Sequence, residues 1–110
     1  MKASSPLAIV AITTAVPGQE RALRTAQETL VAETLKEPGC LRYELNQSQD
    51  DARLLVFIEA WESEAAWRAH MEGAAMRRFA ASGAPNLIAD FALYRMTLVS
   101  GGNAADAAVR

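Results

Sequence analysis

The chain has one histidine, His70, which is the best candidate for acid–base chemistry in the sequence. The charge of a histidine normally changes near neutral pH, so a partly buried imidazole could accept a proton from an acidic phenol or enol. His70 follows Trp67 by three residues on a predicted helix, which places the two rings side by side. The alternative is a core histidine whose ring nitrogen bonds a backbone carbonyl. The hydrogen bond that the ring makes distinguishes the two interpretations.

Three aromatic residues are candidates for binding a substrate. Trp61 and Trp67 could form flat walls for an aromatic molecule, because indole rings favour stacked or edge-on contact with other rings. Plain core packing is the alternative for both. Tyr43 could donate a hydrogen bond to a ligand, or could be a strand tyrosine whose hydroxyl reaches the sheet edge.

Two charged residues stand among apolar neighbours. Glu59 shares a strand face with Trp61, so its carboxyl group either finds a partner or has a raised pKa. An ion pair across the strands, with Arg42 or Arg95, is the favoured role. Arg95 could instead bind a substrate oxygen, or pair with Glu44.

Composition limits the class of protein. The chain has 110 residues, a formal net charge of -2, 51% hydrophobic residues and a single cysteine, which suits one domain without an internal disulfide. One Cys and one His cannot form a closed zinc site, and 11 basic against 13 acidic residues make a nucleic-acid partner unexpected. The longest uncharged stretch, 3–19, is broken by Pro6 and Pro17. We therefore expect a cytoplasmic protein without a membrane span or signal peptide.

The first half of the chain predicts a strand followed by a helix. Leu7–Ala15 is rich in β-branched residues and is soon followed by a Pro-Gly pair, as is typical of a strand. Residues 20–36 have the apolar spacing of an amphipathic helix. Glu37-Pro38-Gly39 would stop that helix, because Pro disfavours helical geometry in its predecessor and Gly permits a left-handed exit.

The second half begins with a predicted hairpin. Apolar and polar residues alternate over 41–46, and a polar turn joins this half-buried strand to the apolar strand Leu54–Trp61. Ser63 would cap a second helix. Gly73 could break it, with helical composition resuming over 75–81.

A last strand over 91–99 completes the order βαββαβ, a ferredoxin-like α+β fold with a four-stranded antiparallel sheet and two helices on one face. Both faces of the strands are apolar, so the face without helices would be larger than soluble monomers normally expose. We expect a second copy to cover it in a homodimer. The domain is expected over 7–99, between an N-terminal segment, 1–6, and a flexible C-terminal tail, 100–110.

Three segments form a further pattern: EPGCLRYEL at 37–45, FIEAWES at 57–63 and AHM at 69–71, followed by Phe79. With them the chain resembles the antibiotic biosynthesis monooxygenase (ABM) domain family over about 7–98. The resemblance implies a dimeric α+β barrel of ferredoxin-like subunits. Members of that family include cofactor-free quinol and polyketide monooxygenases, haem-degrading enzymes and an isomerase of a signalling sugar. The fold alone does not decide among these reactions.

Some positions depart from the patterns of particular members. Haem-degrading relatives have Trp at the place of His70 and an iron-ligating His where Ala80 stands, which argues against haem. Relatives of the polyketide monooxygenase type resemble this chain at Trp61. Many quinol-type relatives have His at the places of Asn46 and Ala75, so His70 is the only imidazole left here.

The resemblance implies a cofactor-independent monooxygenase that acts on quinol-like or polycyclic aromatic small molecules, with no cofactor or metal. A deprotonated quinol can pass an electron to dioxygen, so the protein need only bind it, deprotonate it and exclude water. One alternative is a non-catalytic dimeric barrel that binds a small apolar ligand. Another is an isomerase of a small hydroxyketone. The expected base is His70, and the expected substrate-binding residues are Trp61, Trp67, Tyr43, Glu59 and Arg95.

Overall fold

The computed structural model describes residues 6–101 of the chain. The expected N-terminal segment, 1–6, and C-terminal tail, 100–110, lie outside the described residues except for residues 6, 100 and 101. The predicted order βαββαβ is confirmed, with the second helix divided in two. The elements are β1 (Leu7–Ala15), α1 (Glu20–Thr34), β2 (Cys40–Gln47), β3 (Leu54–Trp61), α2 (Glu64–Met71), α3 (Ala74–Ala81), a 3₁₀ helix η1 (Ala84–Leu87) and β4 (Ile88–Met96).

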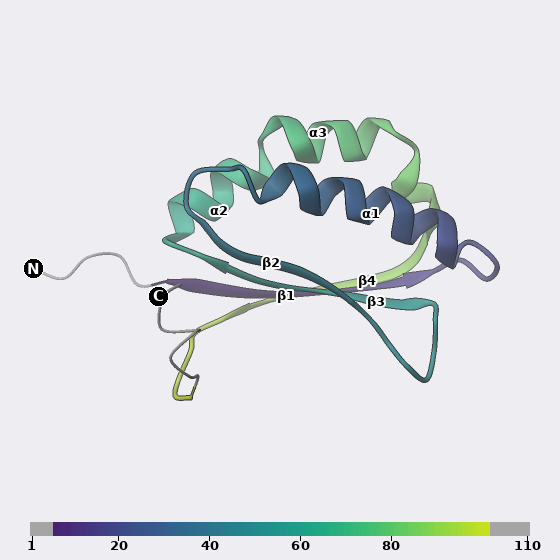
Figure 1. Cartoon of the computed structure of the whole chain (residues 1–110), viewed down its shortest axis with the longest axis horizontal. Helices are drawn as coiled ribbons and strands as arrows, with labels where there is room; N and C mark the ends of the chain where they lie inside the picture. The colour runs from purple at the N-terminus through teal and green to yellow at the C-terminus, as the bar shows by residue number, and fades with distance from the viewer. Residues whose placement is uncertain (1–5, 102–110) are drawn as a thin grey trace, which may run out of the picture.

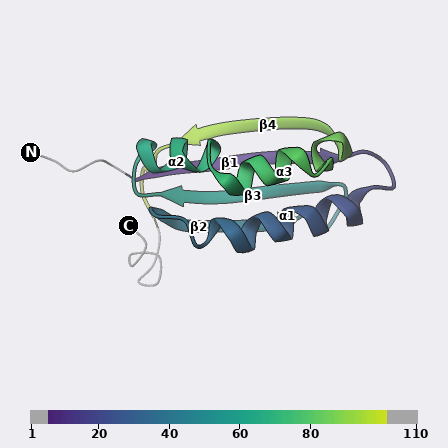
Figure 2. The ribbon, with the colours of Figure 1, turned by 90° about the horizontal axis from the view of Figure 1, so that it is seen from above.

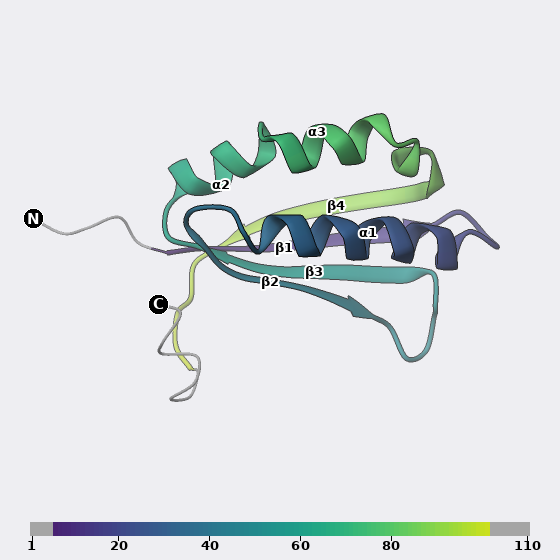
Figure 3. The same ribbon diagram turned by 45° about the horizontal axis from the view of Figure 1, so that its top comes forward.

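The four strands form one antiparallel sheet in the order β2-β3-β1-β4. The three α-helices lie on one face of this sheet, as Figure 1 shows. In Figure 2, α1 runs along the β2 side of the sheet, whereas α2 and α3 lie nearer the β4 side. Figure 3 shows the loop between β2 and β3 projecting away from the helices. This is the predicted ferredoxin-like α+β subunit.

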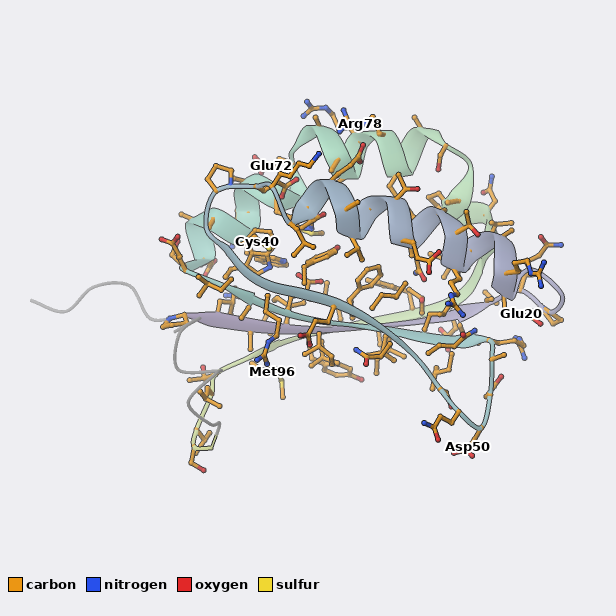
Figure 4. The ribbon with its side chains drawn as sticks, viewed as in Figure 1. Glu20, Cys40, Asp50, Glu72, Arg78 and Met96 are labelled. Carbon is orange, nitrogen blue, oxygen red and sulfur yellow. The ribbon has the colours of Figure 1, made fainter. Side chains whose placement is uncertain are left out.

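Side chains along the central strands β1 and β3 point alternately into the core and to the other face of the sheet. Ile9, Leu55 and Trp61 face the helices and are fully buried. On the opposite side, which we call the helix-free face, Met96 projects away from the helices (Figure 4) and is exposed. The apolar residues that β1 and β3 place on the helix-free face are partly exposed in the chain as described: Val10, Ile12, Val56, Ile58 and Ala60.

The second helix begins and breaks where the sequence predicts. The Ser63 hydroxyl accepts a hydrogen bond from the backbone N–H of Ala66 at 3.1 Å, which caps α2. Gly73 separates α2 from α3 and has extended backbone with φ −85° and ψ 177°. Among the described residues, none of the helices is long and apolar enough to cross a membrane.

The predicted bounds of two elements are wrong. The helix expected over 20–36 ends at Thr34, because the chain tightens into turns before Pro38. The last strand was expected over 91–99 but runs from Ile88 to Met96. Its partner explains the shift, since β4 follows β1 from Ala15 back to Ala8, and few residues of β1 remain beyond Met96.

Gly39 fits the turn after α1 against α2. Its φ of 81° is left-handed, and a Cβ at this position would come 2.6 Å from the Cβ of Ala66. We expect Gly39→Ala to lower the free energy of unfolding by about 2 to 4 kcal/mol, because backbone strain and overpacking act together. Urea unfolding measures the loss.

Gly18→Ala is the matched control for this prediction. Gly18 has a φ of 85°, but no atom of the described residues other than Gly18 and its two chain neighbours lies within 4 Å of its added Cβ. Only the backbone strain of about 1 to 2 kcal/mol is then expected. Adding Ala66→Gly to Gly39→Ala should recover part of the lost free energy of unfolding, because it removes the Ala66 methyl group that the new Cβ would contact. Equal losses in the two single variants would contradict tight packing of the turn on α2.

Candidate functional site

A histidine–carboxylate pair lies at the end of α2. The Nδ1 atom of His70 is 2.8 Å from Oε1 of Glu37, which belongs to the turn after α1. The His70 side chain is 2% exposed and that of Glu37 is 20% exposed. Gly73 lets the chain pack closely on the end of α2, since a Cβ there would come 2.9 Å from the carbonyl oxygen of Ala69.

Aromatic rings enclose the imidazole. His70 stacks on Trp61 with 4.7 Å between ring centroids, and meets the Tyr43 ring edge-on at 5.3 Å. Tyr43 also contacts Phe57 at 5.2 Å and Trp61 at 6.2 Å. These contacts arise because alternation along β2 and β3 directs all three strand residues toward the helices. The structure therefore brings together His70, Tyr43 and Trp61.

Glu59 lies behind the Trp61 indole. Its Oε1 accepts a hydrogen bond of 2.9 Å from Nε1 of Trp61, and the residue is 5% exposed. Burial raises the pKa of Glu59 to about 7, against the opposing effect of the Trp61 hydrogen bond. The raised pKa is one of the two outcomes that the sequence left open for this carboxyl group.

The favoured ion pair of Glu59 with Arg42 or Arg95 is wrong. Arg95 pairs with Glu64 at 2.8 Å. Ile9 of β1 pairs with both Glu59 and Arg95, so a whole strand lies between them and their backbones are about 10 Å apart. Arg42 lies opposite Ala60, which places it on the helix-free face with Glu44, 3.7 Å away.

Trp67 and Arg95 form a second group, nearer the surface. The guanidinium carbon of Arg95 is 5.7 Å from the centre of the Trp67 ring, within the range of a cation–π contact. The indole on which His70 stacks is that of Trp61, and the placement of His70 beside Trp67 stays a prediction. A common pocket for the two tryptophans stays a prediction.

The surroundings of His70 and its bond to Glu37 favour a neutral imidazole in which one ring nitrogen keeps its lone pair. Burial lowers the pKa of His70 below its usual value, although the Glu37 carboxylate acts in the opposite direction. We assign the Nδ1 proton to the bond with Glu37, so Nε2 carries the lone pair of a general base. The alternative bond to a backbone carbonyl is wrong for Nδ1, because its partner is a carboxylate.

Glu37 is the site residue that sequence reasoning missed. The local sequence marks Glu37 only as part of the turn that stops α1, although it is the first residue of the EPGCLRYEL segment. That position in the pattern was the available signal. Within residues 6–101, no group of three or more His, Cys, Asp and Glu side chains is placed to hold a metal ion.

Comparison with known proteins identifies the family. The sequence model of antibiotic biosynthesis monooxygenase (ABM) proteins matches residues 6–82. PA3566 from Pseudomonas aeruginosa is 31% identical, with a TM-score of 0.83 over 91% of this chain and 100% of that one. SO0527 from Shewanella oneidensis is 30% identical, with a TM-score of 0.78 over 84% and 90% of the two chains.

A solved structure named antibiotic biosynthesis monooxygenase is also similar, at 27% identity and a TM-score of 0.79 over 86% of this chain and 99% of that one. No functionally curated protein matches the sequence. The matched region holds Glu37 and His70 and covers every element before η1 and β4. The chain belongs to the antibiotic biosynthesis monooxygenase family.

Proposed function

We propose that the protein is a cofactor-independent monooxygenase acting on quinol-like or polycyclic aromatic small molecules. The observation that supports this most is the 2.8 Å contact between His70 and Glu37 inside an aromatic enclosure. A neutral imidazole held by a carboxylate is suited to remove a phenolic proton. The aromatic neighbours suit a flat substrate and exclude water.

The proposed reaction is balanced by dioxygen alone. Nε2 of His70 takes a hydroxyl proton from the quinol, and the quinolate then passes electrons to dioxygen. One oxygen atom is inserted into a ring C–H bond as a hydroxyl group, and the other leaves as water with the two hydroxyl hydrogens of the diol, so a 1,4-diol becomes a hydroxyquinone. Glu37 acts as a positioning residue, because it fixes the imidazole tautomer and favours the imidazolium that forms.

Oxygen consumption with a panel of hydroquinones, naphthalenediols and anthrones tests this activity. We expect uptake above autoxidation, with one atom from isotopically heavy dioxygen in the product. Heat-denatured protein gives the background rate. No uptake above that background with any member of the panel would overturn the proposal.

A non-catalytic barrel is the second candidate, and one observation favours it. The His70 side chain is 2% exposed, and Trp61 is fully buried, as expected for core residues. In that case an aromatic molecule would bind without consuming oxygen. The roles of Trp67 and Arg95 in binding substrate stay predictions under either function.

We also infer that two copies pack through their helix-free faces into a dimeric barrel. Ile58 lies in the middle of this partly exposed apolar face. Ile58→Asp should therefore give a monomer near 11.8 kDa in light scattering, whereas the unchanged protein should have about twice that mass.

Leu35→Asp is the control for this change, because Leu35 is 56% exposed and follows α1 on the other side of the sheet. This variant should remain a dimer. A mass of 11.8 kDa for the unchanged protein at micromolar concentration would contradict the dimer.

A further inference from the structure

A cavity of about 480 Å³ opens between α1 and the edge strand β2. Val31, Tyr43 and Leu45 provide apolar walls. The rim is polar, and Arg24 and Gln47 meet across it at 2.9 Å, from helix to strand. Its volume lies within the range of about 300 to 1,000 Å³ that is typical of small-molecule sites. We call this cavity the α1–β2 groove.

Tyr43 belongs to both the α1–β2 groove and the enclosure of His70. Tyr43 lines the groove, and its ring meets the imidazole of His70 edge-on, with 5.3 Å between the ring centroids. The groove therefore ends one aromatic ring away from the histidine–carboxylate pair. Because the His70 side chain is only 2% exposed, a substrate must pass a neighbouring side chain to reach it.

We propose that the α1–β2 groove is the substrate-binding site and takes an aromatic 1,4-diol, with Tyr43 separating the bound ring from His70. This inference rests on the proposed monooxygenase function. The two hydroxyl groups of a 1,4-diol point in opposite directions, so one faces Tyr43 while the other lies at the rim. Rotation of the Tyr43 ring then exposes the inner hydroxyl to Nε2 of His70.

The rim has the chemistry to hold the outer hydroxyl. The Arg24 guanidinium bonds Glu28 at 3.3 Å and Gln47 at 2.9 Å, so cation, carboxylate and amide lie together at the opening. The Glu28 carboxylate can accept a hydrogen bond from the outer hydroxyl group. The Arg24 guanidinium stabilises the negative charge that spreads through the substrate ring when the inner hydroxyl is deprotonated. Tyr43 does not compete as a base, because burial and the nearby Glu59 raise the pKa of its phenol above the usual range.

Binding of 2,3-dimethyl-1,4-naphthoquinone to the full chain tests the site without turnover. Its methyl groups block addition of the Cys40 thiol. In amide NMR spectra we expect shifts at Val31, Leu45 and Gln47. Glu28→Trp, at a side chain 55% exposed on the rim, should weaken binding by about tenfold or more.

Leu35→Trp is the matched control, since Leu35 is 56% exposed just after the same helix and does not line the groove. It should bind the quinone as the unchanged protein does. Shifts confined to residues outside the groove, or unchanged binding by Glu28→Trp, would overturn the inference.

Oxygen uptake separates this inference from the proposed function. If both hold, Glu28→Trp raises KM for a naphthalenediol and leaves kcat nearly unchanged. Quinone binding in the groove without any uptake supports the binding site and overturns the monooxygenase. Uptake that depends on His70 but has the same KM in Glu28→Trp overturns the groove and supports the monooxygenase.

Discussion

Replacing His70 by asparagine is expected to lower kcat/KM for quinol oxidation by about 10² to 10⁴-fold, the usual contribution of a general base. The asparagine amide can still donate to Oε1 of Glu37, whereas no lone pair remains at the place of Nε2. Oxygen uptake at saturating and limiting quinol gives the two kinetic constants. Thermal unfolding of the same samples shows whether the fold is kept.

Glu37→Gln tests whether the carboxylate acts through the imidazole. The rate of the unchanged protein should fall as the pH drops through the pKa of His70, because the protonated ring is no base. Since the Glu37 carboxylate raises that pKa, its loss should move the acidic limb to lower pH and reduce kcat/KM less than His70→Asn does. Unchanged kcat/KM in His70→Asn would contradict the role of His70.

The bounds of the central strands could be placed from sequence, but those of the edge strand β4 could not. The predicted bounds of β1 and β3 agree with the structure because their apolar runs end close to Pro-Gly and polar turn residues. The apolar run of β4 continues to Val99, yet pairing begins with Ile88 opposite Ala15 and ends with Met96 opposite Ala8. The neighbouring strand, more than its own composition, sets the limits of β4.

Part of the candidate site followed from alternation along the strands. Period two places Tyr43, Glu59 and Trp61 on the helix-facing side of the sheet, where His70 contacts Tyr43 and Trp61. The contact of His70 with Glu37 spans 33 residues and depends on how the turn after α1 packs on α2. No local pattern encodes such packing.

The partners of Arg95 show the same limit. Glu59 and Arg95 each stand in an otherwise apolar strand, so the sequence suggested an ion pair between them. The intervening Ile9 and the approach of Glu64 from α2 depend on strand order, which a single strand does not specify. Charges could be assigned to a face from sequence, but not to a partner.

Removing the buried charge of Glu59 should make the protein more stable in alkaline solution. The pKa of Glu59 is raised from 4.5 to about 7 in the folded chain. A carboxyl group with a raised folded pKa contributes stability that is complete below pH 4.5 and is lost as the pH rises through about 7. Glu59→Gln abolishes that loss, which amounts to about 3 kcal/mol at most.

The expected gain of Glu59→Gln near pH 8 is about 1 to 3 kcal/mol, because the amide still accepts from Nε1 of Trp61 but buries an N–H group in exchange. Near pH 5 the two proteins should differ little. Urea unfolding at a series of pH values measures both differences.

His70 acts on stability in the opposite direction over part of the same pH range. Its pKa is lowered in the folded chain, so its contribution is present above 6.5 and is lost as the pH falls. Both proteins keep His70, so the difference between them isolates Glu59. Glu62→Gln, at the exposed residue that follows Trp61, should leave the pH profile unchanged. A Glu59→Gln profile parallel to that of the unchanged protein from pH 5 to pH 8 would show that the Glu59 carboxyl ionises in the fold as it does in the unfolded chain.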